Sequence, residues 1–303
     1  MLATLIDAPF DDPEWVFETK WDGIRMIAAA ERGRLTLHSR NGTIVNDRYP
    51  AVATALQKLK RGAVLDGELV AIDRQGVSRF QLLQNALRSE ARLLYCVFDI
   101  MFLGGKDLRG LPLLERKDRL RALLPRDPLL LFSEHRSRYG TRFFEEAERK
   151  GLEGIMAKRA DSPYRSGERS ADWLKIKAVR EQEVVIAGFT EPRRSRSYFG
   201  ALVLAVRDGK SWRYVGRVGT GFSEAVLARL HAVLLALRTH KSPFGKPVKD
   251  EAAITWVKPR LVAEVKFAEW TRAGEMRQPV FLGLRDDKRA EDVVQETESS
   301  RRK

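Results

Sequence analysis

Residues 15–28 constrain this chain most, because an alternating strand, a tight turn and a second strand follow one another there. Side chains alternate between the two faces of a strand, which places Trp15, Phe17, Thr19 and Trp21 on one face and Val16, Glu18 and Lys20 on the other. Asp22-Gly23 is a turn signal, and residues 24–28 read as the second strand. Lys20 sits among large apolar residues, where an ammonium is costly to bury. A lysine held beside a turn can be a covalent nucleophile, but the stretch alone fits a surface hairpin equally well.

Length and charge narrow the class of protein. The chain has 303 residues, enough for one very large domain or two ordinary ones, and its net charge of +14 predicts attraction to nucleic acid. Cys96 is the single cysteine and reads as a buried thiol, so we expect neither an internal disulfide nor a zinc site. No apolar run approaches the roughly 20 residues of a membrane span, and no secretory signal is recognisable. We expect a soluble, cytoplasmic protein with no membrane segment.

The first 180 residues predict strands separated by short helices and turns. Expected strands cover residues 34–39, 64–72, 93–102, 155–158 and 173–178, and the third of these is apolar enough to be buried on both faces. Expected helices run from Asn46 or Asp47 to Leu59, over residues 78–87 and 113–124, and from Gly140 or Thr141 to Gly151. Asn41-Gly42 is a strong hairpin turn.

The organisation changes after about Arg180. Strands are expected over residues 184–189, 201–207, 212–218, 261–270 and 280–284, with one helix over residues 223–240. Short strands with one intervening helix suggest a small five-stranded barrel of the OB type. Residues beyond about Arg289 are polar and expected to fray. The lack of regular βαβ alternation favours an α+β architecture.

Seven short segments, in a fixed order along the chain, carry a family resemblance. They are Lys20-Trp-Asp-Gly-Ile-Arg25, Ser39-Arg40-Asn41-Gly42, Asp66-Gly67-Glu68, Phe98-Asp99, Glu153-Gly-Ile-Met-Ala-Lys158, Trp173-Leu-Lys175-Ile-Lys177 and Arg285-Asp286-Asp287-Lys288. Together they resemble the motifs of ATP-dependent DNA ligases of the covalent nucleotidyltransferase superfamily. The resemblance implies an antiparallel-sheet, ATP-grasp-like adenylation domain over residues 1–181, an OB-fold domain over residues 182–290 and a disordered tail over residues 291–303.

The same resemblance implies the reaction. Lys20 would attack the α-phosphate of ATP to give lysyl-AMP, AMP would pass to the 5′-phosphate of a nick, and the 3′-hydroxyl would displace it. An amine must be neutral to attack, and the reference pKa of lysine is about 10.4. A partly buried site lined by Arg40, Lys175, Lys177 and a metal ion would favour the neutral amine.

Further roles follow for the other motif residues. Glu68 and Glu153 are expected near Mg²⁺, or Mn²⁺ in its place, although either fits a surface ion pair when taken alone. Lys175 and Lys177 lie two apart on a strand, so both can face the α-phosphate, unless they protect an edge strand. The expected ATP-binding set is completed by Arg25 and Arg40 for ribose and phosphate, Phe98 for stacking on adenine, Glu18 or its backbone neighbours for the adenine amino group, and Thr19 and Lys158.

The second domain is expected to contribute charge. By resemblance, Arg285 and Lys288 reach the pyrophosphate after a hinge near residues 177–183 closes, although the spacing alone fits a basic tail. DNA contact is expected to be electrostatic and salt-sensitive, through the basic loop with Arg193, Arg194 and Arg196 and through Arg217 on a strand. Each of these arginines fits a solvated basic face equally well.

The compact layout points to one branch of the family. Lys20 lies so near the start that no N-terminal DNA-binding domain is expected before it, and residues 84–87 and 214–222 resemble the ligase module of bacterial end-joining ligases. This implies a monomer acting on nicked or broken duplex DNA, with the Ku end-binding protein or an end-joining polymerase as partners whose involvement stays open. The competing hypotheses are an RNA ligase, an mRNA-capping guanylyltransferase and a non-catalytic nucleic-acid-binding protein.

Overall fold

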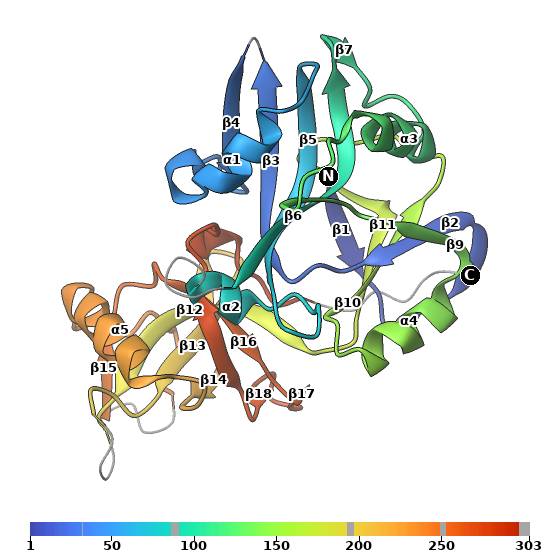
Figure 1. Cartoon of the computed structure of the whole chain (residues 1–303). Coiled ribbons are helices and arrows are strands. Elements are labelled where there is room, and N and C mark those ends of the chain that lie inside the picture. Colours follow the sequence, from blue (N-terminus) through green and yellow to red (C-terminus); the bar gives the residue numbers. More distant parts are fainter. Residues whose placement is uncertain (32, 86–90, 193–196, 249–252, 297–303) are drawn as a thin grey trace. The chain divides into compact units, whose positions relative to one another are not determined.

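The computed structural model describes residues 1–31, 33–85, 91–192, 197–248 and 253–296, which form two compact units, Met1–Val179 and Arg180–Glu296. Both units consist mainly of antiparallel strands with a few short helices, which confirms the expected α+β class (Figure 1). Among the described residues, none of the helices combines the length and apolar character needed to cross a lipid bilayer.

The first sheet of the N-terminal unit has five strands. Their order is β1 (Leu2–Leu5), β11 (Arg169–Lys177), β10 (Gly154–Arg159), β2 (Asp11–Thr19) and β9 (His135–Tyr139), and only β1 and β11 pair in parallel. One face of this sheet packs on α4 (Gly140–Arg149) through a core that includes Phe17, Ala147 and Ile176. The other face is therefore available to the second sheet and to the site.

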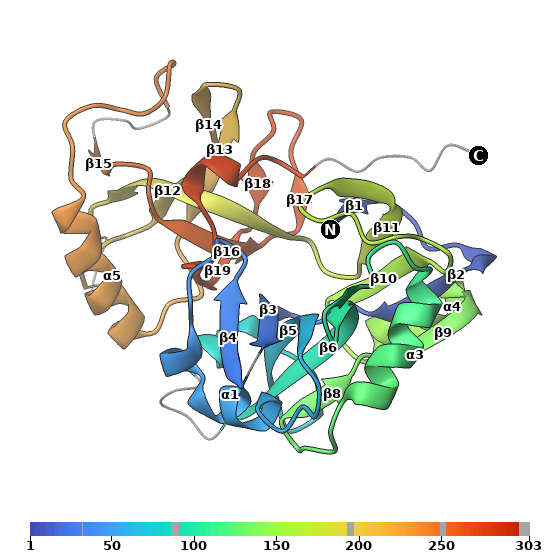
Figure 2. The same cartoon turned by 90° about the horizontal axis from the view of Figure 1, so that it is seen from above.

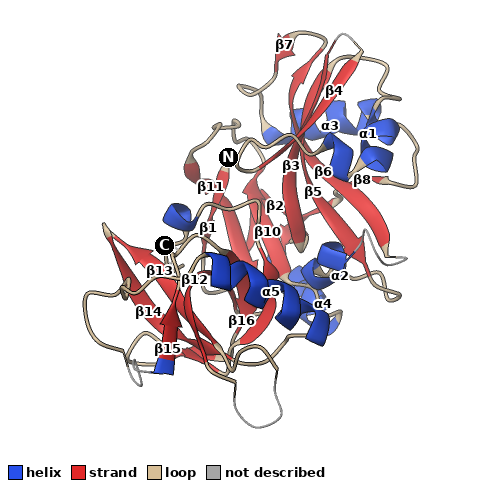
Figure 3. Ribbon diagram, turned by 90° about the vertical axis from the view of Figure 1, so that its left-hand side faces the viewer, coloured by secondary structure: helices blue, strands red, loops and turns tan. Residues whose placement is uncertain are grey.

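The second sheet carries most of the helices of this unit. Its order is β4 (Arg34–Ser39), β3 (Gly23–Glu31), β5 (Ala63–Ile72), β6 (Arg92–Leu103) and β7 (Lys106–Asp107), with β8 (Leu130–Phe132) parallel to β6. Packed around it are α1 (Pro50–Leu56), α2 (Phe80–Asn85) and α3 (Leu113–Leu123), and Figure 3 shows the strands of both sheets in red. Residues Leu94 to Val97 of β6 are buried, as the apolar run predicts.

The expected helix from Asn46 is interrupted. Asn46–Arg48 form a single 3-10 turn, and the α-helix begins only at Pro50. The side chain of Asn46 bonds the backbone of Leu37 and Leu35 instead of capping a helix. Proline also disfavours helical geometry in the residue before it, which removes Tyr49 from the helix.

The hairpin interpretation of residues 15–28 is wrong. Both edges of β2 are already paired, with β9 and β10, while β3 pairs with β4 and β5 in the second sheet. Lys20, Trp21 and Asp22 thus form a crossing between two sheets, not a turn within one. The predicted alternation is correct, because Phe17 belongs to the α4 core and Glu18 lies on the opposite face.

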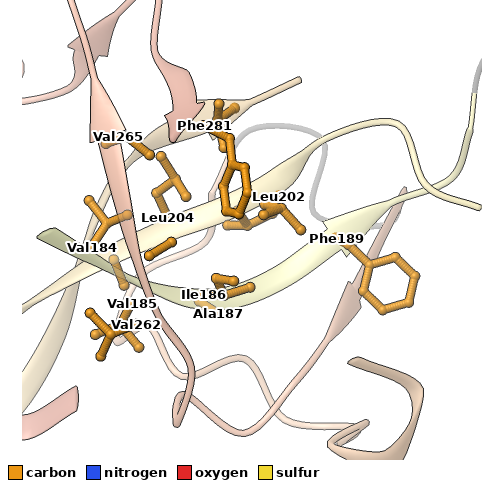
Figure 4. Packing of buried hydrophobic residues seen from close by; sticks show 14 of the residues in the cluster. Val184, Val185, Ile186, Ala187, Phe189, Leu202, Leu204, Val262, Val265 and Phe281 are labelled. Atoms are coloured by element: carbon orange, nitrogen blue, oxygen red, sulfur yellow. The ribbon is translucent and has the colours of Figure 1, made fainter. Parts of the chain in front are cut away.

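The second unit is built around β12 (Glu181–Thr190). The sheet order is β14 (Ser211–Val218), β13 (Leu202–Asp208), β12, β16 (Val262–Lys266) and β19 (Val280–Leu284), with β15 (Ile254–Trp256) on the end of β12. The side chains of Val184 to Ala187 are buried with those of the neighbouring strands (Figure 4). The order fits the expected OB-type domain, but the ladder does not close into a barrel. A single parallel bridge joins Thr220 to Val280.

Two expected elements of this unit are shorter than predicted. The strand predicted over residues 261–270 divides into β16, which pairs with β12, and β17 (Glu269–Trp270), which pairs with β18 (Met276–Arg277). The change of partner begins at Ala268, whose N–H donates to the carbonyl of Arg277. The helix α5 (Glu224–Ala236) lies beside the strands of this unit (Figure 2) and begins with the predicted Ser223 cap. It ends early because Thr239 bonds the carbonyl of Trp256.

The prediction of a disordered tail after residue 290 is wrong for residues 291–296. Ala290–Asp292 form a 3-10 turn, and Val293 is 2% exposed against the core of the second unit. The carbonyl of Val293 accepts from Arg207, and Gln182 bonds the backbone of Val294 and Glu296. The polar composition of this segment gave no sign that it packs on the core, because only two small apolar residues, Ala290 and Val293, anchor it. Residues 297–303 lie outside the described residues.

Candidate active site

One face of the first sheet carries the predicted lysines in neighbouring rows. In the strand register Glu18, Met156 and Lys175 lie opposite one another, as do Gly154 and Lys177. The backbone N–H of Lys20 donates to the carbonyl of Gly154 at 3.0 Å and continues this pairing. Residues opposite one another on antiparallel strands share a face. Lys20, Lys175 and Lys177 therefore project to the same side of the sheet.

The alternative for Lys175 and Lys177, protection of an edge strand, is wrong. Their strand β11 lies between β1 and β10, so both of its edges are paired. Both lysines are half-buried and flank the buried Ile176. Two cationic side chains held on one face of an interior strand suit the binding of an anion better than the protection of an edge.

Lys20 forms an ion pair with Glu153. Lys20 directly follows β2 and Glu153 directly precedes β10, so the pairing of these two strands brings the residues together. Their side chains are 17% and 9% exposed, which makes this a largely desolvated contact. The pair sets a carboxylate against the amine that the sequence identifies as the nucleophile.

Glu18 lies in a buried cluster with two lysines. Its Oε1 accepts from Lys117 Nζ at 2.8 Å, and its Oε2 accepts from Lys158 Nζ at 3.0 Å and from Ser133 Oγ at 3.1 Å. Burial alone would raise the pKa of this carboxyl, but the charges of Lys117 and Lys158 outweigh it and lower the pKa. Burial, in turn, lowers the pKa of Lys158 despite the attraction of Glu18. Glu18 is therefore ionised and already accepts three hydrogen bonds.

Sequence reasoning missed Lys117 and Ser133. A signal for Lys117 was present, because Leu113, Lys117 and Leu120 are spaced to lie on one face of a helix. A lysine on the apolar face of an amphipathic helix requires a buried partner, and Glu18 supplies it. Ser133 had no such signal, since a lone serine after a short strand is unremarkable in sequence.

Arg25 is held by Asp66, a residue of the third motif to which no role was assigned. The guanidinium donates to both carboxylate oxygens, at 3.0 and 2.6 Å, and Asp66 also accepts from the hydroxyl of Tyr164 at 2.7 Å. Although burial opposes its charge, the carboxylate of Asp66 raises the pKa of Arg25. Glu68 lies opposite Arg25 in the register of β3 and β5 and is half-buried.

Phe98 is half-buried, with cations on its ring. Its ring meets that of Trp173 edge-on, with centroids 5.9 Å apart, and Lys158 Nζ lies 4.3 Å from each ring centroid. Arg25 Cζ lies 5.7 Å from the centroid of Phe98. Trp173 Nε1 is buried and has no hydrogen-bond partner among the described residues. The structure thus places Phe98 beside two predicted site residues, Lys158 and Arg25, in contact with the core but not enclosed by it.

Two of the expected ATP-binding residues stand apart from this group. Arg40 is exposed in the turn after β4. Thr19 pairs with Ile155, and strand alternation places it on the face opposite to Lys20. The Thr19 side chain therefore points away from the face that carries Lys20, and only its backbone lies next to the lysine.

Arg285 and Lys288 are held by acids of the second unit. Arg285 bonds both oxygens of Asp287, at 2.8 and 2.9 Å, and Glu264 at 2.8 Å, while Lys288 Nζ lies 2.5 Å from Glu183. Burial opposes the charge of Arg285, but Glu264 and Asp287 raise its pKa. The alternative of a basic tail is therefore wrong for these two residues.

The predicted DNA-contacting residues are only partly visible. Arg217 lies on β14 opposite Val203 and is half-buried. Arg193, Arg194 and Arg196 lie outside the described residues.

Family models and similar proteins match almost the whole chain. A family model described as "ATP dependent DNA ligase domain" matches residues 1–177, and one described as "ATP dependent DNA ligase C terminal region" matches residues 195–288. The chain is 41% identical to the multifunctional non-homologous end joining protein LigD of Pseudomonas aeruginosa over 97% of its own length and 36% of that protein. It is 40% identical to LigD of Mycolicibacterium smegmatis, over 95% of the chain and 38% of that protein.

Solved structures also match the chain over almost its whole length. A structure described as mycobacterial DNA ligase D complexed with ATP and MES matches with a TM-score of 0.68 and 37% identity, covering 97% of this chain and 98% of that chain. The ligase domain of LigD from M. tuberculosis matches with a TM-score of 0.53, 37% identity and the same coverage. The chain therefore spans little more than a third of the length of its curated relatives, and that third matches a ligase domain.

Proposed function

The chain belongs to the ATP-dependent DNA ligase family, and we propose that it seals breaks in duplex DNA through an AMP-bearing Lys20. The resemblance found in the sequence, to the ligase module of bacterial end-joining ligases, is confirmed at the level of the family. The observation that carries the proposal is the position of Lys20, paired with Glu153 and on the same sheet face as Lys175 and Lys177. We assign residues 1–181 to adenylation and residues 182–290 to the OB-type domain.

The first step is the attack of Lys20 Nζ on the α-phosphorus of ATP. A nitrogen–phosphorus bond forms, the bond to pyrophosphate breaks, and the amine gives up a proton. The ion pair with Glu153 favours the charged amine, so it must separate or transfer its proton before the attack. Glu153 contacts the amine directly and is the residue placed to accept that proton.

Lys175 and Lys177 are proposed to bind the α-phosphate as point charges. Phe98 presents a half-buried ring for stacking on adenine, with Lys158 against the ring and Glu18 bonded to Lys158. Arg25 and Arg40 are proposed for ribose and phosphate. In the later steps AMP moves from Lys20 to the 5′-phosphate of the break, and the 3′-hydroxyl then displaces AMP to form the phosphodiester.

Glu68 and Glu153 are proposed as the carboxylates for Mg²⁺ or Mn²⁺. Within the described ranges, no group of three or more His, Cys, Asp or Glu side chains could hold a metal ion by itself. Mg²⁺ is commonly bound by one or two carboxylates together with substrate phosphates and water, so two glutamates fit an ion that binds with ATP. When bound, the ion would stabilise negative charge on the phosphates.

Arg285 and Lys288 are proposed to bind the pyrophosphate after leaving their acidic partners. Lys288 Nζ pairs with Glu183, and Arg285 is bonded to Glu264 and Asp287; the side chains of Lys288 and Arg285 are both 9% exposed. The hinge near residues 177–183 stays a prediction.

Broken duplex DNA is the proposed polymeric substrate. The net charge of +14 and the half-buried Arg217 support electrostatic binding to phosphates. The end-joining names of the relatives support a role in the repair of DNA breaks. We further propose that the protein acts as a monomer in the cytoplasm, at the nucleoid. The chain spans only part of the length of those relatives, so the partners of the whole proteins are proposals for it. Ku and an end-joining polymerase are the candidate partners.

The RNA ligase and guanylyltransferase hypotheses lose support, because both family models are those of DNA ligases. The paired Lys20 and Glu153 also weigh against a purely nucleic-acid-binding protein. The test is sealing of a labelled nicked DNA duplex with ATP and Mg²⁺, beside an RNA nick and beside labelling of the protein with ATP or GTP. We expect DNA sealing and an AMP adduct that Lys20→Ala abolishes. Preferred labelling by GTP, or an adduct on Lys20→Ala, would contradict the proposal.

A further inference from the structure

A single buried hydroxyl joins the two residues that flank Lys20 in space. Ser133 Oγ accepts from Trp21 Nε1 at 3.1 Å and donates to Glu18 Oε2 at 3.1 Å. Trp21 directly follows Lys20, and Glu18 precedes it by two residues. The hydroxyl therefore spans the nucleophile segment from one side of Lys20 to the other.

Ser133 is itself held firmly. Its backbone N–H donates to the carbonyl of Val97 at 2.8 Å, and its own carbonyl accepts from Lys117 Nζ at 2.9 Å. Lys117 also donates to Glu18, so the ammonium ties Ser133 and Glu18 together a second time. Ser133 is 1% exposed, which leaves no room for water to replace these bonds without a shift of neighbouring atoms.

Backbone and side-chain hydrogen bonds anchor both ends of the crossing between the two sheets, and the Trp21 side chain between them packs on the cluster of Val70, Leu94 and Cys96. On one side, the N–H of Lys20 donates to Gly154. On the other side, the backbone N–H of Asp22 donates to Ser78 Oγ at 3.0 Å, and the carboxylate of Asp22 accepts from the N–H of Phe80 at 2.8 Å. Between these anchors, the described residues offer the Trp21 side chain one hydrogen-bond acceptor, Ser133.

We propose that Ser133 is a positioning residue for the reaction: its hydroxyl, supported by Lys117, clamps Glu18 and Trp21 and thereby sets the direction of the Lys20 side chain. The inference rests on the proposed role of Lys20 as nucleophile. Ser133 does not touch ATP or the reacting atoms in this scheme. A misplacement of about 1 Å at a reacting group costs up to about a hundredfold in rate, so a clamp on the backbone has a measurable effect.

The three chemical steps separate this role from a general contribution to folding. Lys20 is the nucleophile in the first step and the leaving group in the second. In the third step the 3′-hydroxyl attacks a 5′-adenylated DNA end, and Lys20 forms or breaks no bond. A positioning residue for Lys20 therefore slows formation of the AMP adduct and spares the sealing of DNA that already carries AMP.

The experiment measures both steps in Ser133→Ala. Single-turnover adenylation is expected to slow about tenfold, and saturating labelled ATP separates this effect from any change in ATP binding that arises through Glu18. Sealing of a pre-adenylated nicked duplex without ATP is expected to proceed at the wild-type rate. Equal slowing of both reactions, or an unchanged adenylation rate, would overturn the proposal.

Matched variants guard against a folding defect. Ser162→Ala removes another buried hydroxyl, one that donates to the carbonyl of Arg159 at 2.7 Å, and is expected to leave both rates unchanged. Trp21→Phe removes only the indole donor and is expected to slow adenylation less than Ser133→Ala. The double variant should be no slower than Ser133→Ala, because both changes break one link. Independent, multiplying effects would count against the clamp. If Ser133→Ala proves too unstable to assay, Trp21→Phe alone decides, and an unchanged adenylation rate in that variant would overturn the proposal.

Failure of this inference and failure of the proposed function are distinguishable. A Lys20→Ala variant that still becomes labelled would remove Lys20 as the nucleophile, whatever Ser133 does. An unlabelled Lys20→Ala variant together with a normal Ser133→Ala variant would retain the nucleophile and reject only the clamp.

Discussion

Lys20 and Glu153 form an ion pair between the residue that follows β2 and the residue that precedes β10. The two residues are 133 positions apart, and only the antiparallel pairing of their strands brings them together. The pair holds the amine in a defined place and also holds it in its charged form. Separation of the pair, or transfer of its proton to Glu153, is therefore part of any reaction in which Lys20 is a nucleophile.

Replacing Glu153 with alanine should impair catalysis more than folding. We expect formation of the AMP adduct to slow by about 10²-fold or more, because both the proposed proton acceptor and a proposed metal ligand are lost. The thermal midpoint should fall less than for a fully buried pair, since the Lys20 side chain is 17% exposed and water can reach it when its partner is removed. The measurement is single-turnover labelling with ATP at saturating Mg²⁺, beside a melting curve. Unchanged labelling would remove Glu153 from both roles.

Replacing Glu18 with glutamine should destabilise the first unit strongly. The change leaves Lys117 and Lys158 buried without a countercharge, and breaking a buried ion pair on one side costs about 3–5 kcal/mol. Urea unfolding gives the free energy directly, and Glu146→Gln, at an ion pair of the surface with Arg136, is the matched control. A loss of less than about 1 kcal/mol would show that the cluster is not desolvated as described.

Glu18 should also make the stability of the protein depend on acid pH. Its folded pKa lies below its ordinary value, because the two lysines outweigh burial. The stabilisation is therefore fully present above the unfolded pKa of about 4.3 and is lost as pH falls through the folded pKa. Urea unfolding between pH 6 and pH 3 should lose part of its acid dependence in Glu18→Gln, and an identical dependence would contradict this.

Replacing Lys288 with alanine should slow adenylation by about tenfold and leave folding intact, because one charge on the pyrophosphate is lost. Lys288 pairs with Glu183, and Arg285 is bonded to Glu264 and Asp287, so a melting curve beside each assay separates a loss of stability from a loss of catalysis. Sealing of a pre-adenylated nick involves no pyrophosphate and should be spared. If that sealing slows as much as adenylation, Lys288 acts on DNA and not on the leaving group.

Arg217→Ala should weaken binding to nicked duplex DNA and reduce its dependence on salt. Loss of one phosphate contact lowers the slope of log affinity against log salt by about 1. Fluorescence anisotropy over a range of salt concentrations measures this, with Arg74→Ala, on a turn of the first unit, as a charge-matched control. An unchanged slope would place Arg217 outside the DNA-binding surface.

Much of the local structure could be predicted from the residues. The strands at residues 34–39 and 280–284 have the predicted bounds, and the apolar run around Cys96 is a strand buried on both faces. The Ser223 cap was also predicted. These features depend on side chains near one another in sequence, where alternation, turn residues and capping follow directly from the residue types.

The sequence alone also determined the family and the set of candidate residues, because seven motifs occur in one order along the chain. The tertiary structure decided which partners those residues have. Residues 15–28 became a crossing between two sheets, Glu18 became the shared partner of Lys117 and Lys158, and the tail anchored itself through Val293. Each outcome depends on contacts between residues far apart in the chain. Local patterns carry no information on such contacts, since burial and ion pairing are settled only when the sheets pack.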